Sequence, residues 1–479
     1  MAYYHGISTS QAPTSVSTPV VAATGIPFVV GTAPAHTVGG KANELILANS
    51  YAEAVAALGY SDDWEKYTLC EAIYSQFVLY GRAPVILVNV LDIDKHNSDV
   101  DITEYQITKG KIELPLEAIA SSVIVKSAAT GGTEYVYDTD YTTYYSDSAL
   151  IIEATETGAL IGAASAFVSY SEVDTSVVSN SDIIGGYDVN TGKTTGLELI
   201  ENCFSKFQTV PDLLLAPGYS SDSEVAAVLA TKTTINGLFR AKALIDVDTK
   251  TVTKYTDVNE WKNKNNITDE NQIVCWAMAT LGERRFHGST IVAGTMAVTD
   301  YDNGDCPSES PSNKSAKIDG MCLEDGTEIT LNLVQANYLN SIGVVTFLNF
   351  VGGFKVWGNE TACYPTNTDV KDYFINVSRM FDWVNNTFIL SFWSKIDNNI
   401  TRRLIDSIVD SFNIYLNGLT SSEKILGGRV EFDSSENDVT SLMGGVIKVH
   451  TYLTPPSPAK EISNTFEYDT SYIESFLAN

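Results

Sequence analysis

The stretch Ile26-Pro27-Phe28-Val29-Val30-Gly31 has the pattern of a buried strand, and Pro84-Val85-Ile86-Leu87-Val88-Asn89-Val90 has the pattern of a second one. Between them, residues 63–80 carry apolar side chains at helical spacing, and Gly81 follows as a stop signal. Strands that are apolar on both faces are typical of parallel sheets with helices on both sides. The order strand, helix, strand therefore predicts a βαβ unit and an α/β core.

The character of the sequence changes on both sides of this unit. Residues 92–180 lose the helical spacing and carry short β-branched or aromatic runs, at 122–126, 134–137, 150–154 and 166–170. They predict a small all-β domain inserted into the α/β framework. Residues 181–360 return to alternating helices and strands, so we expect 25–91 and 181–360 to form one α/β core domain. This core should contain helices at 51–58, 197–207 and 223–235, one strand at 273–279, and a loop at 300–330.

Residues 361–458 predict a C-terminal α+β domain. Helices are expected at 369–383 and 401–417, and strands at 428–432 and 446–453. Thr401 can cap the start of the second helix, and Gly418 can cap its end. The fold class is thus a multidomain combination of α/β and α+β units.

Two arginines open the second of these helices. Cations at a helix N-terminus oppose the helix dipole, so Arg402 and Arg403 are unusually placed. Either they contact an acidic partner, or Asp397 and Asp406 pair with them inside the chain.

Both ends of the chain are predicted to be extended arms. Residues 1–24 are rich in Ser, Thr, Ala and Pro and show no amphipathic period. Residues 459–479 follow a Pro-rich stretch, and within them 461–468 alternate in the manner of a strand. The expected contact side chains are Tyr3, Tyr4, Val16, Val20 and Val21 in the first arm, and Ile462, Phe466, Tyr468, Tyr472 and Phe476 in the second. The aromatic C-terminal arm is expected to be the more specific anchor.

The charge balance argues against two classes of partner. The formal net charge is −29, with 59 acidic and 30 basic residues. A nucleic-acid binder needs a basic surface for phosphates, and an anionic membrane repels an acidic protein. The start of the chain has no secretory signal pattern, and its most apolar run, 342–354, is too short to span a bilayer. We therefore expect a soluble intracellular product.

The six cysteines are scattered along the chain without a C-x-x-C pair. Reduced thiols are the expectation, and Cys306 and Cys322, which flank a loop-like stretch, are the one pair that merits a check.

Several short motifs approach known chemistry without matching it. Gly192-Lys193-Thr194 resembles the end of a P-loop, but the glycine that the motif requires falls on Tyr187, so a glycine-rich turn is favoured. Residues 300–305 resemble the start of a calcium loop, but the glycine stands at position five, which favours an acidic surface turn.

The remaining candidates for chemistry are equally weak. Arg284-Arg285-Phe286-His287 is a basic cluster, either a contact patch or a solvated loop. No G-x-S-x-G turn and no zinc-type histidine pair occurs. We therefore expect no enzyme, no cofactor and no metal site.

The order and spacing of several segments resemble the tail sheath proteins of contractile phage tails and phage-derived R-type bacteriocins. The segments are 25–34 (GIPFVVGTAP), 185–197 (GGYDVNTGKTTGL), 213–220 (LLLAPGYS), 416–419 (LNGL), 425–432 (ILGGRVEF), 444–456 (GGVIKVHTYLTPP) and 466–469 (FEYD). Together they cover most of the chain, and the resemblance is weakest over 92–180.

The resemblance implies a structural subunit that stacks as hexameric rings around an inner tube. It contracts to drive the tube through a target cell envelope. The implied partners are copies of itself, the inner tail tube protein, and baseplate and tail terminator proteins, with no nucleic acid and no membrane insertion. The protein would be made in the cytoplasm of a bacterial host and released by lysis as part of a particle.

The resemblance also assigns tasks to particular segments. The arms add strands to the sheets of neighbouring subunits, and the receiving strands would contain Val430, Phe432, Ile447, Val449 and Tyr452. A helix of the C-terminal domain holds the tube, which makes Arg402, Arg403, Asp406 and Asp410 candidate tube contacts.

Two other functions remain open from the sequence. One is a nucleotide hydrolase that uses Gly192, Lys193 and Thr194. The other is a surface module that binds glycans or a receptor through residues 92–180.

Overall fold

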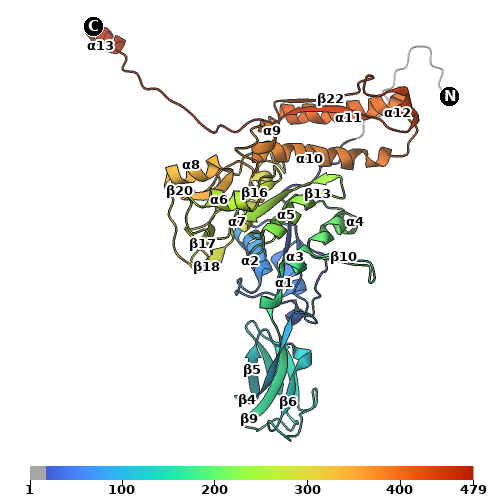
Figure 1. Cartoon of the computed structure of the whole chain (residues 1–479), viewed down its shortest axis with the longest axis vertical. Helices are drawn as coiled ribbons and strands as arrows, with labels where there is room; N and C mark the ends of the chain where they lie inside the picture. Colours follow the sequence, from blue (N-terminus) through green and yellow to red (C-terminus); the bar gives the residue numbers. More distant parts are fainter. Residues whose placement is uncertain (1–17, 478–479) are drawn as a thin grey trace, which may run out of the picture.

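The computed structural model describes residues 18–477, and its centre is an eight-stranded sheet (Figure 1). Six parallel strands lie in the order β3, β1, β12, β15, β16, β20, with an antiparallel strand, β2 or β21, at each edge. The parallel strands are Val85–Asn89, Pro27–Gly31, Leu213–Leu215, Lys242–Asp246, Gln272–Cys275 and Val344–Asn349, and the edges are Ile46–Ala48 and Phe354–Trp357. Apart from Asn349, every residue of the six parallel strands is buried, which confirms the predicted α/β core.

Helices cover this sheet, and most begin or end where the pattern predicted. They are α1 (Tyr51–Leu58), α2 (Thr68–Ile73), α5 (Ser223–Lys232), α6 (Val258–Lys264), α7 (Gly288–Asp302) and α8 (Leu333–Ser341). The helix predicted at 63–80 starts only at Thr68 and continues from Tyr74 to Tyr80 as a π-helix. The helix predicted at 197–207 is a 3₁₀-helix, Gly196–Asn202, followed by α4, Cys203–Phe207.

Two predictions in the core are wrong. Residues 300–302 end α7 and are not loop; twelve of the fifteen residues of this helix are buried, so it has no polar stripe for a pattern to reveal. Its Gly294 lies so close to the Tyr80 ring that a Cβ there would come within 2.2 Å of it. The single strand predicted at 273–279 is two strands, β16 and β17 (Met278–Leu281), separated by the buried Trp276 and assigned to different sheets.

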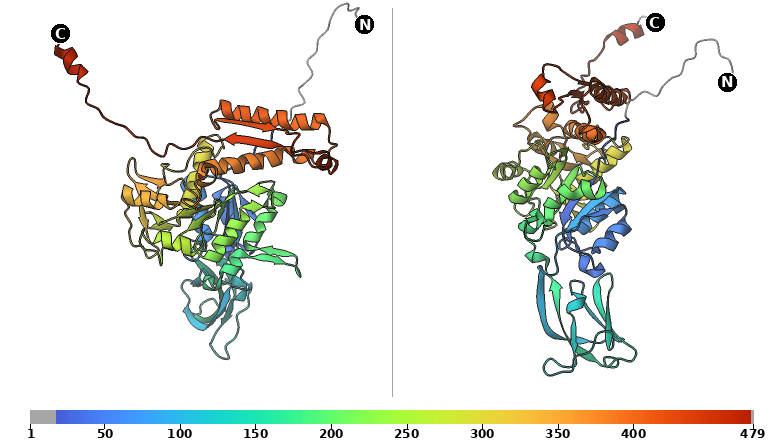
Figure 2. Two further views of the ribbon diagram at one scale, coloured as in Figure 1. Left: turned by 45° about the horizontal axis from the view of Figure 1, so that its top comes forward. Right: turned by 90° about the vertical axis from the view of Figure 1, so that its right-hand side faces the viewer.

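Residues 97–173 build two three-stranded antiparallel sheets with a buried cluster of their own. One sheet is β4 (Asn97–Gln106), β9 (Ser165–Val173) and β6 (Ile124–Lys126), and the other is β5 (Lys111–Pro115), β8 (Ala149–Ala154) and β7 (Tyr141–Tyr145). The run at 134–137 forms isolated bridges and no strand. This part projects from one end of the molecule (Figures 1 and 2).

The C-terminal part lies at the opposite end and contains two long helices and a hairpin. They are α10 (Ile375–Phe392), α11 (Arg402–Ser421), β22 (Gly427–Glu431) and β23 (His450–Thr454), with the short α9 (Val370–Tyr373) and α12 (Val439–Met443). The helix predicted at 369–383 is interrupted at Phe374 and runs on to Phe392, and α11 continues past Gly418. The second strand starts at His450, four residues later than predicted.

The C-terminal end leaves the body as an exposed extension (Figure 2). Residues 461–468, predicted to be a strand, have no strand partner and no regular structure within the described chain. They lead to a short helix, α13 (Ser471–Leu477). No helix within residues 18–477 combines the length and apolarity that a membrane span requires.

Candidate assembly site

The β22–β23 hairpin has one closed edge and one open edge. The side-chain amide of Asn413, on α11, donates to the Val430 carbonyl (2.9 Å) and accepts from the Val430 N–H (2.8 Å). Val430 therefore directs its backbone groups away from β23. Its partner in the register is Thr451, whose backbone must likewise point away from β22. In residues 18–477 nothing outside the hairpin bonds the backbone of Thr451 or Leu453, so β23 offers the free edge.

The residues predicted to receive an arm differ in burial and in their position relative to the open edge of β23. Val430 is buried, and Phe432 follows the end of β22. Ile447 and Val449 precede β23 and are half-buried, and the Asn437 amide already bonds both backbone groups of Lys448 between them. Tyr452 lies on β23 itself. Of the residues predicted to receive an arm, Tyr452 is thus the one that lies on the strand whose outward backbone groups are unbonded within residues 18–477.

Tyr452 is the centre of an exposed cluster on the hairpin. The His450 ring stacks on it with 4.4 Å between centroids, and the Arg429 guanidinium lies 3.9 Å from its ring centre on the other strand. These contacts stiffen the two strands next to the open edge, because stacked and cation–π pairs fix side-chain rotamers.

The chain enters the body alongside α10. The Val20 N–H donates to Ser391 Oγ (2.9 Å) and the Ala22 N–H to Thr387 Oγ1 (3.1 Å), while Trp383 Nε1 donates to the Ala22 carbonyl (2.8 Å). The arm predicted for 1–24 is therefore wrong at its inner end, because residues 20–24 belong to the fold. Val20 and Val21 keep their side chains half-exposed; Tyr3, Tyr4 and Val16 lie outside the described residues.

A buried ion cluster fixes this entry point. Arg379, on α10, donates to Asp300 Oδ1 (2.9 Å), to Asp212 Oδ2 (2.8 Å) and to Thr24 Oγ1 (3.1 Å). Asp212 also accepts from the Ile26 N–H at 2.7 Å. Burial raises the pKa of Asp300, and Arg379 opposes that rise. The cluster connects α7, α10 and the start of the first strand. Asp300 is buried, so the prediction of an acidic surface turn at 300–305 is wrong for this residue.

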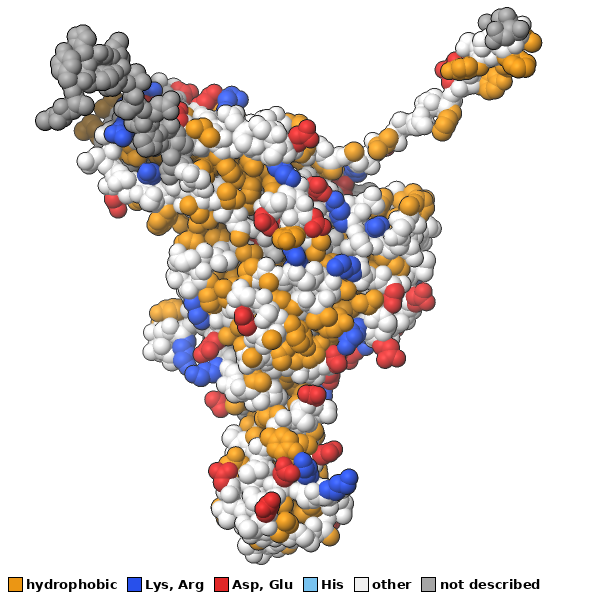
Figure 3. All heavy atoms as spheres, turned by 180° about the vertical axis from the view of Figure 1, so that it is seen from behind, with side chains coloured by type: hydrophobic (Ala, Val, Ile, Leu, Met, Phe, Trp, Pro, Cys, Tyr) orange, Lys and Arg blue, Asp and Glu red, His pale blue; other side chains and the backbone are white. Residues whose placement is uncertain are grey.

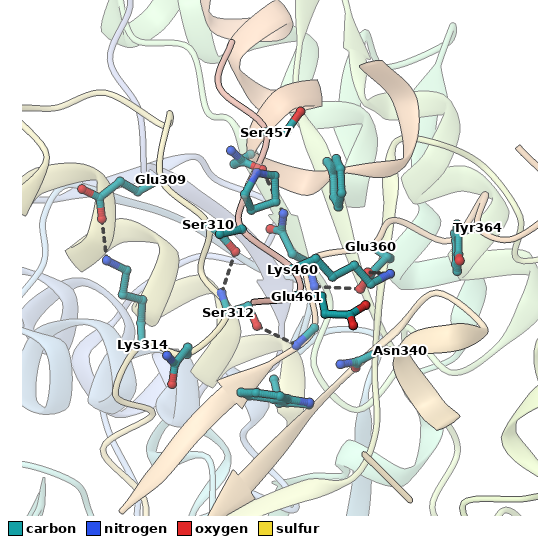
Figure 4. A pocket seen from close by; sticks show the side chains of 18 of the residues that line it. Glu309, Ser310, Ser312, Lys314, Asn340, Glu360, Tyr364, Ser457, Lys460 and Glu461 are labelled. Carbon is teal, nitrogen blue, oxygen red and sulfur yellow. Dashed lines mark hydrogen bonds and ion pairs between the residues drawn. The ribbon is translucent and has the colours of Figure 1, made fainter. Parts of the chain in front are cut away.

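The C-terminal arm begins in a groove of about 1010 Å³ that is lined by both polar and apolar side chains (Figure 4). Lys460 Nζ lies 2.7 Å from Glu360 Oε1, a carboxylate that is only 4% exposed. Burial by itself would lower the pKa of Lys460. Glu360 raises it by a larger amount, so the pKa lies above its ordinary value. Asn376 donates to the Pro456 carbonyl at 3.3 Å. These contacts end at Lys460, and the arm residues Ile462, Phe466 and Tyr468 that follow it are all exposed.

The predicted tube-contact residues lie on the first turns of α11. Arg402 Nε bonds Asp406 Oδ1 at 2.9 Å, one turn along the helix, so the pairing within the chain is confirmed for this arginine. Arg403 and Asp410 are exposed and have no ion-pair partner among the described residues.

The motifs that suggested chemistry form no reaction site. Gly192 and Lys193 belong to an antiparallel hairpin, β10 (Gly186–Asp188) with β11 (Lys193–Thr195), and not to a turn between a parallel strand and a helix. The Asp188 carbonyl accepts from the Gly192 N–H, which fills the loop that a phosphate would need. No group of three metal-ligating side chains occurs in residues 18–477.

The basic cluster and the cysteines also have structural explanations. Arg284 and Arg285 pair with Asp62 and Glu65. Burial alone would lower the pKa of His287, but Glu71, 2.7 Å away, raises it to about 9. All six cysteines, Cys306 and Cys322 included, are free and buried.

Comparison with known proteins shows which proteins this chain is similar to. No protein-family model matches the chain. A tail sheath protein of Burkholderia phage BcepMu is 26% identical over 484 residues, which cover 98% of this chain and 98% of that protein. Over nearly its whole length the chain is similar to tail sheath proteins. A prophage protein of Pseudomonas aeruginosa strain UCBPP-PA14, which carries the name major tail sheath protein, is 26% identical over 65% of this chain and 78% of its own length.

Solved sheath structures share the fold. The PVC sheath of an extracellular contractile injection system, in its contracted state, superposes with a TM-score of 0.58 at 14% identity, covering 98% of this chain and 99% of that one. A sheath tail protein from Desulfitobacterium hafniense gives 0.51 at 12% identity, covering 90% and 94%. The fold of this chain is therefore that of a sheath subunit over nearly its whole length.

Sequence reasoning missed the residues that shape the candidate site. Asn413, Arg379 and the pair Lys460–Glu360 act through contacts between distant segments. The sequence offered one signal, which concerns Asn413 and Arg379. Both are polar residues on the apolar face of a predicted helix, where a polar side chain needs a partner inside the protein.

Proposed function

We propose that this tail sheath subunit polymerises as stacked hexameric rings around an inner tube and contracts to drive that tube through a target cell envelope. The observation that supports this proposal is that the chain contains both an open strand edge and an extended segment that could pair with such an edge. The β22–β23 hairpin has a free edge on β23, and the C-terminal arm is an exposed, alternating segment without a strand partner. An extended segment that lacks a partner in its own subunit can add to the open edge of a neighbour.

This contact joins unlike surfaces, so it propagates from subunit to subunit and does not close on itself as a dimer. The net charge of −29 keeps free subunits apart, and the close backbone contacts of strand addition have to overcome that repulsion. The length of the arm lets neighbours stay linked while their bodies rotate, which is the motion that contraction requires.

The proposed partners follow from the same arrangement. They are copies of this chain, an inner tube protein that contacts α11 near Arg403 and Asp410, and baseplate and terminator proteins at the ends of the sheath. The solved relatives include sheath and baseplate assemblies of an anti-feeding prophage, which supports these partners. We propose the division 25–91 with 181–360, 92–180 and 361–458, with the β sheets of 92–180 on the outside of the sheath. The protein would be made in a bacterial host and released in a particle.

The test is electron microscopy of the chain co-expressed with its tube protein. The proposal expects tubes with a hexameric cross-section, and mass spectrometry should find both proteins in them. A chain that remains monomeric with the tube protein, at concentrations and salt conditions that screen its charge, would contradict the proposal.

A further inference from the structure

The last helix of the C-terminal arm has an apolar face that no other residue of 18–477 covers. Tyr472, Ile473, Phe476 and Leu477 stand at positions i, i+1, i+4 and i+5 of α13 and share one side of the helix. Tyr472 is 76% exposed and Phe476 81%. Figure 3 shows these hydrophobic side chains gathered at the end of the extended arm. A seven-residue helix is too short to be stable alone, so this face calls for a docking surface.

The body of the subunit carries an apolar groove that such a helix fits. The groove has a volume of about 1030 Å³ and lies between α4, the hairpin β13 (Thr234–Ile235) and β14 (Phe239–Arg240), and the end of α10. Its apolar lining includes Phe204, Leu238, Ile389 and Trp393. The Trp393 side chain is 60% exposed and Leu238 39%. Large exposed apolar side chains around one hollow mark a protein contact surface.

The groove lining carries no charge that would repel the acidic helix. Residues 461–479 contain four acidic residues and no Lys or Arg. None of the residues that line this groove is acidic, whereas four other cavities of the described surface each have two or more carboxylates in their lining. Lys395, next to the lining residue Ser394, forms no ion pair within residues 18–477. In a chain with 59 acidic residues, an acid-free groove is the surface that repels an acidic segment least.

The arm delivers this helix away from its own body. Lys460 anchors the root of the arm, and the ten residues 461–470 span at most about 35 Å when extended. Figures 1 and 2 show α13 at the end of this tether on the side opposite α4 and β13. The partner best placed to present the groove is therefore a second copy of the chain.

We propose that α13 of one copy docks with its apolar face in the groove of a second copy, between α4, the β13–β14 hairpin and the end of α10. This inference rests on the proposed sheath function and adds a second contact to strand addition. The strand segment supplies backbone bonds that any extended sequence could make. The helix supplies side-chain contacts that are specific for another copy of this chain.

A disulfide test between two preparations decides whether the contact exists. One carries Phe476→Cys and the other Leu238→Cys, and the six native cysteines are buried. We expect mild oxidation of tubes formed from the mixture to give a linked dimer whose peptides join positions 476 and 238. Val334→Cys is the matched control, because Val334 is 78% exposed on α8 and does not line the groove; it should give no such link. Tubes of normal appearance without a 476–238 link, or with position 476 linked to the tube protein, would overturn the inference and leave the sheath function standing.

A charge pair tests the chemistry of the groove. Leu238→Glu places a carboxylate where the acidic arm docks, and Leu238→Lys places a cation at the same point. We expect Leu238→Glu to raise the concentration needed for assembly at least tenfold over Leu238→Lys at low salt. Equal concentrations for both variants would contradict the docking. If the unmodified chain forms no tubes, the sheath function fails, and a 476–238 link between dissolved copies would still support the inference.

Discussion

The two ends of the described chain leave the body in opposite ways. On the N-terminal side, Val20 and Ala22 are bonded to α10, and Thr24 joins a buried ion cluster. On the C-terminal side, the Lys460–Glu360 pair is the last anchor before residues that are exposed throughout. The N-terminal root, residues 20–24, is part of the fold. The C-terminal root, the ion pair between Lys460 and Glu360, is the last contact that holds the arm to the body.

This difference separates two tasks that a sheath subunit has to combine. At the N-terminal root, residues Val20 to Thr24 are held in place by contacts with the body. A loosely held C-terminal root lets the second arm follow a neighbour that moves.

The ion cluster at the N-terminal root should dominate the stability of the subunit. Arg379→Met keeps the bulk of the side chain but leaves Asp300 and Asp212 buried without their cation. We expect the free energy of unfolding to fall by about 3–5 kcal/mol. Urea denaturation of the dissociated subunit measures it. Arg402→Ala removes an exposed ion pair and should change the value by less than about 1 kcal/mol. A loss below 1 kcal/mol for Arg379→Met would show that the cluster does not hold this root.

The body and the arms should also differ in their response to pH. The pKa of His287 is raised from 6.5 to about 9 by Glu71, although burial opposes it. Its contribution to stability is therefore complete below pH 6.5 and is lost as the pH rises through 9. It amounts to roughly 3 kcal/mol at most. Denaturation curves from pH 6 to 9.5 should show this fall, and His287→Gln should flatten it. Strand addition by the arm uses backbone groups and should show no such transition.

Hydrogen bonds to α10 also hold the N-terminal root, and each should contribute less than the ion cluster. Ser391→Ala removes the acceptor of the Val20 N–H and should cost about 1 kcal/mol or less. Hydrogen exchange at Val20 should accelerate, while the buried strands stay protected. Ser394→Ala, a neighbouring exposed serine, is the control and should change neither quantity. Unchanged exchange at Val20 would mean that the N-terminal root is held by other contacts.

The C-terminal root should respond locally and leave stability almost unchanged. Glu360→Gln removes the charge partner of Lys460, whose side chain is half-exposed, so we expect a loss below about 1 kcal/mol. Hydrogen exchange at residues 457–461 should nevertheless speed up. If the whole subunit loses as much stability as Arg379→Met does, the two roots are alike and the comparison is wrong.

The sequence predicted the elements whose pattern does not depend on distant partners. The continuous apolar runs of β1 and β3 located these strands to within one residue, and the apolar stripe of α11 located its start. The helix α7 escaped because it is buried on nearly all sides and so lacks the polar positions that mark a period. The alternation at 461–468 predicts a strand, but a strand needs a partner, and residues 18–477 of the single subunit provide none.

The candidate site could be predicted only in outline. The two arms followed from composition, but Arg379 meets Asp300 and Asp212 across 79 and 167 residues of sequence. Similarly, the closure of β22 by Asn413 depends on how α11 packs on the hairpin, and no local pattern encodes that packing. Those contacts place residues 20–24 in the fold, and within residues 18–477 they leave the outward backbone groups of Thr451 and Leu453 on β23 without a bond from outside the hairpin.

We propose that the C-terminal arm couples one subunit to the next. The most direct test of this proposal is electron microscopy of a chain that ends at Lys460, co-expressed with the tube protein and compared with the full chain and with a chain that lacks residues 1–17. We expect the chain ending at Lys460 to stay folded and monomeric, with an unfolding curve within about 1 kcal/mol of the full chain, because the removed residues are exposed. Normal tubes from this truncated chain would contradict the account.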